Sequence, residues 1–72
     1  MVLGAAVRSF RELRGFTQEE LTDRARLSKN TVGNIERGDS APTFPVLVAV
    51  SEALGLPLSE LIHAYEDRLS SS

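Results

Sequence analysis

The sequence predicts an all-α fold of five helices, and three observations carry this prediction. Apolar residues recur at spacings of three and four along the chain, and no stretch shows the alternation of a half-buried β-strand. Glycine and proline interrupt these periodic stretches at intervals of roughly one short helix. A chain of 72 residues can bury one modest hydrophobic core, so we expect residues 1–72 to form a single domain.

The first two helices are predicted from their apolar stripes and from the residues at their ends. We expect the first helix over residues 3–14, with Gly15 ending it. The second should begin at Thr17, because the Thr17 hydroxyl and the Glu20 carboxylate can each accept a hydrogen bond from the other residue's backbone amide. The inward residues of these two helices are Leu3, Val7, Phe10, Leu21 and Ala25.

The third and fourth helices are predicted in the same way. Ser28 is a good N-cap for the third helix, and Gly38 is expected to end it. Residues 39–42 form a loop by composition, and Thr43 caps a fourth helix in which Pro45 falls where no amide donor is yet needed. The inward residues of these helices are Val32, Ile35, Phe44, Leu47, Val50 and Leu54.

The fifth helix follows Gly55 and Pro57, and we expect residues 70–72 to be a frayed tail. Its apolar residues at helical spacing are Leu58, Leu61, Ile62, Tyr65 and Leu69. The stripes of all five helices together predict one core, shared by Val7, Phe10, Phe16, Leu21, Ala25, Val32, Ile35, Phe44, Leu47, Val50, Leu54 and Leu61.

The composition argues against several classes of function. The chain has no cysteine and a single histidine, His63, so we expect neither a disulfide framework, nor a metal site, nor a cofactor. No nucleophile is evident for His63 to activate and no glycine-rich phosphate loop is present, which argues against an enzyme. The longest apolar run, residues 46–50, is far shorter than the ~20 residues that span a bilayer. We therefore expect a cytoplasmic protein with no membrane partner and no small-molecule effector site.

The formal net charge of −2 conceals an asymmetry along the chain. Residues 1–37 carry seven basic and five acidic side chains, a net charge of +2. Residues 38–72 carry one basic and five acidic side chains, a net charge of −4. The basic half is the half that the motifs below assign to nucleic acid, but so few basic groups predict weak non-specific binding to DNA.

The middle of the chain resembles a known DNA-binding motif. The residues that carry the resemblance are Thr17-Gln18-Glu19-Glu20-Leu21, Ser28, Val32 and Ile35-Glu36-Arg37-Gly38. They are similar to the helix-turn-helix of the phage-repressor-like family, also called the xenobiotic-response-element family. The likeness continues outward through Leu3-Gly4, Val7, Phe10-Arg11 and Gly15-Phe16, and through Pro42-Thr43-Phe44, Leu47, Ala53-Leu54-Gly55 and Leu58-Ser59-Glu60-Leu61. The resemblance implies a five-helix domain, with its helix-turn-helix at about residues 17–37, that regulates transcription by binding double-stranded DNA.

Two positions depart from the family pattern. The turn between the second and third helices commonly has a glycine in the left-handed conformation, where this sequence has Arg26. That conformation would cost Arg26 on the order of 1 kcal/mol or more, so a differently built turn is an open alternative. Thr22 stands where the family prefers alanine for close contact between helices.

The third helix is expected to read DNA bases. Directing Val32 and Ile35 inward leaves small and polar residues on the opposite face, with a lysine at its edge. Asparagine can both donate to and accept from adenine in the major groove, lysine can donate to guanine, and a glycine permits close approach. The predicted base-reading residues are Lys29, Asn30, Gly33 and Asn34.

Three further residues are expected to contact DNA phosphates. In relatives, the residue that matches Gln18 begins the second helix and contacts phosphate, and the residue that matches Arg37 often does so too. A helix N-terminus offers unpaired amides to an anion, and glutamine adds a donor there. Thr43, at the start of the fourth helix, is a third candidate, although capping alone explains it.

Other residues are assigned to structure and assembly. Arg11 and Glu36 match the pair that joins the first helix to the third in relatives, so we expect a structural ion pair. Apolar surface beyond what one small core absorbs predicts a homodimer through the fifth helix. Its candidate interface residues are Leu58, Ile62, Tyr65 and Leu69. Such a dimer would present two recognition helices about 34 Å apart to a roughly palindromic operator.

The alternative function is a protein-interaction module, such as an antitoxin-type regulator that holds a protein partner. Val46, Val48 and Ala49 support it, because they lie off the inward stripe of the fourth helix and an apolar surplus often marks an interface. A homodimer uses this surplus more simply than a foreign partner does. Binding to a promoter-sized duplex at two salt concentrations separates the alternatives.

Overall fold

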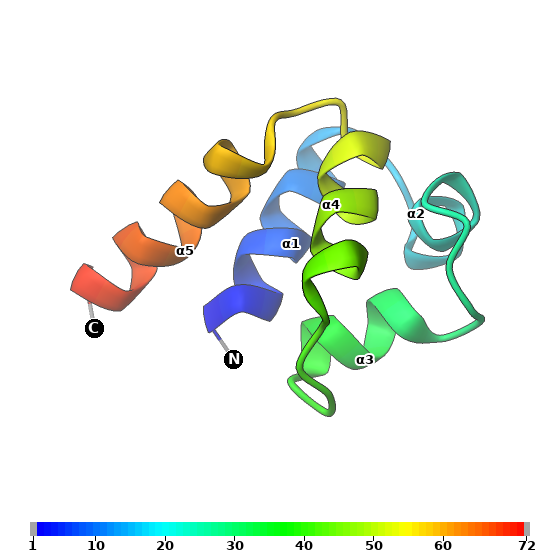
Figure 1. The fold of residues 1–72 in the computed structure, drawn as a ribbon, viewed down its shortest axis with the longest axis horizontal. Coiled ribbons are helices and arrows are strands. Elements are labelled where there is room, and N and C mark those ends of the chain that lie inside the picture. Colours follow the sequence, from blue (N-terminus) through cyan, green and yellow to red (C-terminus); the bar gives the residue numbers. More distant parts are fainter. Residues whose placement is uncertain (1, 72) are drawn as a thin grey trace.

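The computed structural model describes residues 2–71, and all of its regular structure is helical over that range (Figure 1). The five helices are α1 (Val2–Leu13), α2 (Gln18–Arg24), α3 (Thr31–Arg37), α4 (Phe44–Ala53) and α5 (Leu58–Ser71). The predicted all-α fold is therefore confirmed.

Two helices begin at the threonines that the sequence identified as caps. Thr17 Oγ1 accepts a hydrogen bond from the Glu20 amide at 3.0 Å, and the Thr17 amide donates to Glu20 Oε1 at 2.9 Å. Thr43 Oγ1 accepts from the Val46 amide at 3.4 Å, with Pro45 in the first turn of α4. Local sequence alone fixes these two helix starts, because each cap needs only residues that are three apart.

The α3 start differs from the prediction. Ser28 is not its N-cap: the helix begins at Thr31, whose amide donates to the Ser28 carbonyl at 3.1 Å. Asn30 occupies the cap position in the left-handed conformation, with φ 71°, and its side chain makes no capping hydrogen bond. Ser28 therefore lies too early to cap α3, because residues 28–31 form a turn of their own.

The turn after α2 is built as in the family, but with arginine. Arg26 has φ 57°, and the Leu27 amide donates to the Thr22 carbonyl at 3.0 Å. Thr22 is buried where the family prefers alanine, and its hydroxyl donates to the Gln18 carbonyl at 2.8 Å. Each departure from the family pattern is thus accommodated, one with backbone strain and one with a local hydrogen bond.

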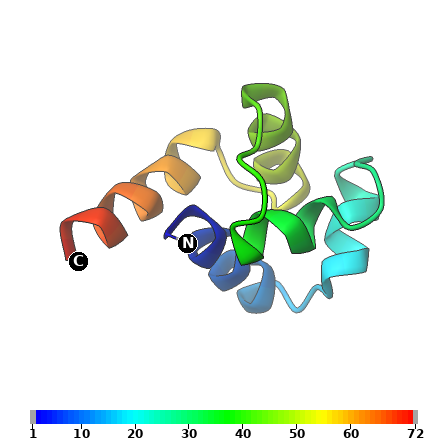
Figure 2. The same cartoon turned by 90° about the horizontal axis from the view of Figure 1, so that it is seen from below.

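Helix α1 lies at the centre of the fold, between α5 on one side and the α2–α3 pair on the other (Figures 1 and 2). It packs directly on α3 and α5, and α4 contacts α2 and α5. The contact with α3 is close at Gly4, where an added Cβ would lie 2.4 Å from the Ile35 carbonyl oxygen and 2.6 Å from that of Glu36. Only glycine permits this approach of α1 to the α3 backbone.

The core matches most of the predicted set. Its buried members are Ala6, Val7, Leu21, Val32, Ile35, Val50, Leu54, Leu56 and Leu61. Ala25 is also buried, whereas Phe10, Phe16 and Leu47 are partly buried against the core. Phe44 was wrongly assigned to it: its side chain is 68% exposed, because it is the first residue of α4 and emerges from the loop beyond the packed layer. The sequence prediction missed Ala6 and Leu56.

Helix α5 extends away from the helix-turn-helix and carries the predicted dimer residues. Leu58, Ile62 and Tyr65 are half-buried, and Leu69 is 50% exposed. The helix continues through Ser71 rather than ending before residue 70, and Ser72 lies outside the described residues. No single described helix is long and apolar enough to cross a membrane; α4 and α5 reach that length only as a pair bent by 106°.

Candidate nucleic-acid interface

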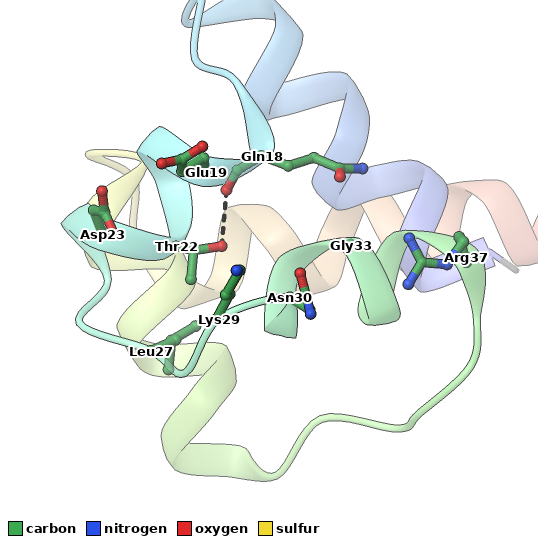
Figure 3. A pocket seen from close by; sticks show the side chains of 9 residues that line it. All are labelled: Gln18, Glu19, Thr22, Asp23, Leu27, Lys29, Asn30, Gly33 and Arg37. Atoms are coloured by element: carbon green, nitrogen blue, oxygen red, sulfur yellow. Dashed lines mark hydrogen bonds between the residues drawn. The ribbon is translucent and has the colours of Figure 1, made fainter.

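A groove of about 600 Å³ lies between α2 and α3 (Figure 3). Its lining comes from both helices and from the turn that joins them: Gln18, Glu19, Thr22, Asp23, Leu27, Lys29, Asn30, Gly33 and Arg37. Five of these were predicted to meet DNA, and the fold brings all five to one surface. Lys29 and Asn30 lie in the turn before α3, not on the helix as expected, because the helix starts later.

Arg37 lies along the outer side of α3 rather than extending from its end. Its Nε donates to Asp39 Oδ2 at 2.9 Å, and its Nη2 donates to Asn34 Oδ1 at 2.6 Å. Figure 3 shows the guanidinium turned back toward Gly33. Asn34 thus uses its carbonyl oxygen on Arg37, and its amide nitrogen keeps its two donors for other acceptors.

Gly33 is buried beneath side chains on the groove side, although the sequence predicted an open position. A Cβ added there would lie 3.0 Å from Arg37 Nη1 and 3.1 Å from Gln18 Oε1. The absence of a side chain at Gly33 lets the Arg37 guanidinium and the Gln18 amide approach each other over α3. Glycine at this position therefore serves the placement of two proposed phosphate contacts.

Gln18 connects the two helices of the motif. It is the first residue of α2 and exposed, and its Nε2 donates to Glu36 Oε1 of α3 at 3.1 Å. This hydrogen bond directs the Gln18 side chain along α3, while the first amides of α2 stay at the protein surface. The start of α2 and the outer side of α3 are therefore held in a fixed relation.

Arg11 and Glu36 meet in a two-pronged ion pair between α1 and α3. Arg11 Nε lies 2.7 Å from Glu36 Oε2 and Nη2 lies 3.0 Å from Oε1, with side chains 11% and 3% exposed. Arg11 Nη1 also donates to the Phe16 carbonyl at 2.8 Å. The hydrogen bonds to Glu36, aided by its charge, raise the pKa of Arg11 against the opposing effect of burial. The pair anchors the end of α3 that carries Arg37.

Thr43 lies outside the groove. It is exposed at the start of α4, and its hydroxyl already accepts the Val46 amide. Any contact of Thr43 with phosphate would thus use its backbone amide or share the hydroxyl. Among the described residues, no group of three or more histidine, cysteine, aspartate or glutamate side chains is arranged to hold a metal ion.

Sequence reasoning missed two acidic residues that line the groove, Glu19 and Asp23. They offset Lys29 and Arg37, so the groove is not strongly basic despite lying in the basic half of the chain. The signal was available: directing Leu21 and Ala25 inward turns Glu19 and Asp23 outward on α2. A polyanion would consequently be attracted only weakly to this surface by charge alone.

Comparisons with known proteins agree with this geometry. A helix-turn-helix family model matches residues 7–61. The immunity repressor protein of Bacillus phage phi105 is 34% identical over 62 residues, 86% of this chain and 43% of the repressor. The transcriptional regulator ClgR of Mycobacterium tuberculosis is 36% identical over 69 residues, 96% of this chain and 62% of the regulator. The crystal structure of the clp gene regulator ClgR from Corynebacterium glutamicum has a TM-score of 0.89 at 32% identity, covering 96% of this chain and 73% of that one.

The chain spans less than two thirds of the phage repressor and of the mycobacterial regulator. The match nevertheless covers both helices of the motif and the helices that support them. It agrees with the resemblance seen in the sequence and with the expectation of a binding protein rather than an enzyme. The chain belongs to the phage-repressor-like helix-turn-helix family of DNA-binding transcriptional regulators.

Proposed function

We propose that this protein regulates transcription by binding a specific, roughly palindromic DNA site as a homodimer, with α3 in the major groove. The observation that carries the proposal is the outer side of α3, where Gln18, Asn34 and Arg37 converge around a glycine. This surface is polar, narrow and backed by a buried ion pair, and an α-helix of this width fits the major groove of B-form DNA.

Base reading is assigned to Lys29, Asn30 and Asn34, with Gly33 in a supporting role instead of the base contact that the sequence predicted. The Asn34 amide nitrogen can donate to adenine N7 or guanine O6, while its oxygen remains on Arg37. Lys29 and Asn30 are exposed in the turn before α3. They therefore lie at its N-terminal end, which helix-turn-helix proteins direct toward the bases. Gly33 supports these contacts by leaving room for the Arg37 and Gln18 side chains that cover it.

Phosphate contacts are assigned to Gln18, Arg37 and Thr43. Gln18 and Thr43 stand at the starts of α2 and α4, where backbone amides and the helix dipole favour an anion. Arg37 offers a planar fork that matches the geometry of a phosphate. These contacts fix the register of α3 on the duplex and carry no sequence information themselves.

Dimerisation is assigned to α5, through Leu58, Ile62, Tyr65 and Leu69. These residues are partly exposed on α5, the helix that lies away from α2 in Figure 1, and a second copy can cover them. A two-fold dimer would match the symmetry of a palindromic site. A regulator of this kind works where the DNA is, which we take to be the cytoplasm.

Selection of binding sites from random-sequence duplexes tests this function. We expect the wild-type protein to enrich one roughly palindromic motif, and Asn34→Ala to relax the preference at one base pair of each half-site. A loss of about 1–3 kcal/mol per removed base contact should appear on the preferred site, in addition to a smaller loss on all duplexes from the release of Arg37. Two outcomes would contradict the assignment of α3 to base reading. Either the wild-type protein enriches no motif, or wild type and Asn34→Ala enrich motifs with the same base preference at every position.

A second candidate function is an interaction module that holds a protein partner. The specific observation in its favour is Phe44, which is exposed at the start of α4 one helical turn before the half-buried Val48. Val46 packs against the core instead. If this surface served the main function, Phe44→Ser would abolish regulation in cells while leaving affinity for the selected duplex unchanged. Loss of DNA binding in Arg37→Ala with intact regulation would favour the same candidate.

A further inference from the structure

Arg37 is held by an acidic residue that lies beyond the end of its helix. Asp39 accepts from Arg37 Nε at 2.9 Å, and the two side chains are 57% and 60% exposed. Asn34, three residues before Arg37, accepts a hydrogen bond from Arg37 Nη2. The guanidinium is therefore bonded through both Nε and Nη2 within the protein itself.

The backbone at the end of α3 determines where Asp39 lies. Gly38 adopts the left-handed conformation, with φ 77°, and its amide donates to the Ile35 carbonyl at 3.1 Å. The Asp39 amide then donates to the Asn34 carbonyl at 2.9 Å. These two hydrogen bonds form the closing motif of a helix C-terminus and direct the chain back toward Arg37. This path of the chain places the Asp39 carboxylate next to Arg37 Nε.

Stability does not explain an aspartate at this position. A carboxylate just after a helix C-terminus lies at the negative end of the helix dipole, which is unfavourable. An ion pair as exposed as Arg37–Asp39 has an effect of similar small size and opposite sign, so the net gain in stability is small. A negative charge beside a DNA-binding arginine also repels phosphate. Neither stability nor charge attraction therefore accounts for an aspartate at this position.

The donors that remain on Arg37 indicate another role for Asp39. A guanidinium has five N–H groups, of which Asp39 takes the one on Nε and Asn34 takes one on Nη2. The remaining N–H groups, two on Nη1 and one on Nη2, are the donors left for phosphate oxygens. Gly33 leaves room for Nη1, because a Cβ there would lie 3.0 Å from Nη1 and 3.1 Å from Gln18 Oε1.

We propose that Asp39 is a positioning residue for DNA binding: together with Asn34 it holds the Arg37 guanidinium over Gly33, so that the N–H groups left on Nη1 and Nη2 meet a DNA phosphate. This inference rests on the proposed function and adds a residue to it. Because Asp39 acts through Arg37, its removal weakens binding even though a repulsive charge is lost. A side chain that acted only through its charge would give the opposite sign.

Binding of the selected duplex by Asp39→Ala, Asp23→Ala and wild-type protein tests the sign. Asp23 is the matched control, an exposed aspartate that lines the same groove. We expect Asp39→Ala to lower affinity about two- to tenfold, the range of one lost hydrogen bond. Asp23→Ala should raise affinity or leave it unchanged, and Asp39→Asn, which keeps an oxygen acceptor, should recover part of the loss.

The same substitutions in an Arg37→Lys background complete the test. Lysine keeps the positive charge but not the fork, so Asp39→Ala should no longer lower affinity there. In the protein without DNA, the Arg37 Nε–H should exchange with solvent faster in Asp39→Ala than in Asp23→Ala, as measured by NMR.

Two results overturn the proposal. One is an increase in affinity for Asp39→Ala that matches Asp23→Ala. The other is a loss of affinity on Asp39→Ala that is equally large in the wild-type background and in the Arg37→Lys background. In both cases wild-type protein still binds its site, and the proposed function stands. A wild-type protein that binds no duplex refutes the proposed function and the role of Asp39 together.

Discussion

Gly4 and Gly33 lie in helices for different reasons. At Gly4 the obstacle to a side chain is backbone, because an added Cβ would fall 2.4–2.8 Å from atoms of Ile35 and Glu36. At Gly33 the obstacle is the far end of two flexible side chains, Arg37 and Gln18, which can move. One glycine is needed to pack α1 on α3, and the other to arrange the groove.

Gly4→Ala should therefore destabilise the fold by about 1–3 kcal/mol, since α1 must move away from α3 and the core must repack. Urea unfolding gives the change. Gly33→Ala is the control: it should leave stability equal or up to about 1 kcal/mol higher, because alanine favours helix, while DNA binding weakens. Equal stability losses in both variants would show that the close approach at Gly4 is unimportant.

Of the side-chain contacts around α3, the sequence predicted one and could not predict another. The Arg11–Glu36 pairing follows from the family resemblance, and both residues lie where that resemblance puts them. The contact of Arg37 with Asn34 and Asp39 does not follow, because it depends on the rotamer of a long side chain and on the turn at Gly38. The two polar residues of α3 assigned to separate tasks are therefore coupled by a hydrogen bond.

At the scale of the elements, the turn between α2 and α3 stores strain at Arg26. Its φ of 57° is a conformation that glycine adopts readily and arginine does not. We expect Arg26→Gly to stabilise the protein by about 1 kcal/mol and to raise Tm by roughly 4–8 °C for a domain of this size. Calorimetry measures the shift. Arg26→Ala removes the same charge but keeps the Cβ, so an equal gain in that variant would exclude relief of strain as the cause.

The capping box makes the start of α2 sensitive to acid. The hydrogen bond from the Thr17 backbone amide, together with that from the Thr17 hydroxyl and the nearby charge of Arg24, holds the pKa of Glu20 below its ordinary value. A lowered pKa in the folded state means that the unfolded chain takes up the proton first as pH falls. The contribution of Glu20 to stability is thus complete above the ordinary glutamate pKa and is lost as pH falls through the lowered pKa.

Glu20→Gln should consequently make the free energy of unfolding depend less steeply on pH in this acidic range. Urea midpoints measured across the range, for wild type and variant, test the expectation. Glu19→Gln changes a carboxylate in the same turn that lies outside the capping box. If both variants flatten the profile equally, the hydrogen bonds of the box are not its cause.

Helix ends were predictable where the signal is local and not where it depends on backbone conformation. Thr17, Thr43 and Gly38 mark real boundaries because capping involves residues within one turn. The start of α3 was misplaced because a left-handed Asn30 closes a separate turn, which no side-chain pattern announces. Phe44 has the spacing of a core residue, but its helix extends beyond the core at that end.

For the whole molecule, the proposed dimer depends on the exposed strip of α5. Leu69→Lys should raise the dimer dissociation constant about tenfold or more, because a charge would be buried without a partner. Analytical ultracentrifugation over a concentration series measures it. Leu13→Lys alters an exposed leucine on α1 and should have no effect. Wild-type protein that sediments only as monomer at high concentration, with and without DNA, would refute the dimer.

The central claim is that α3 and the Arg37 fork bind the DNA backbone and bases, and its most direct test is affinity for the selected duplex over a salt series. For Arg37→Ala, we expect weaker binding to all duplexes alike and a slope of log affinity against log salt reduced by about one unit per lost phosphate contact. Asn34→Ala should instead lose most affinity on the preferred site. A wild-type affinity that does not change with salt, or identical slopes and sequence profiles for the two variants, would contradict the placement of α3 on DNA.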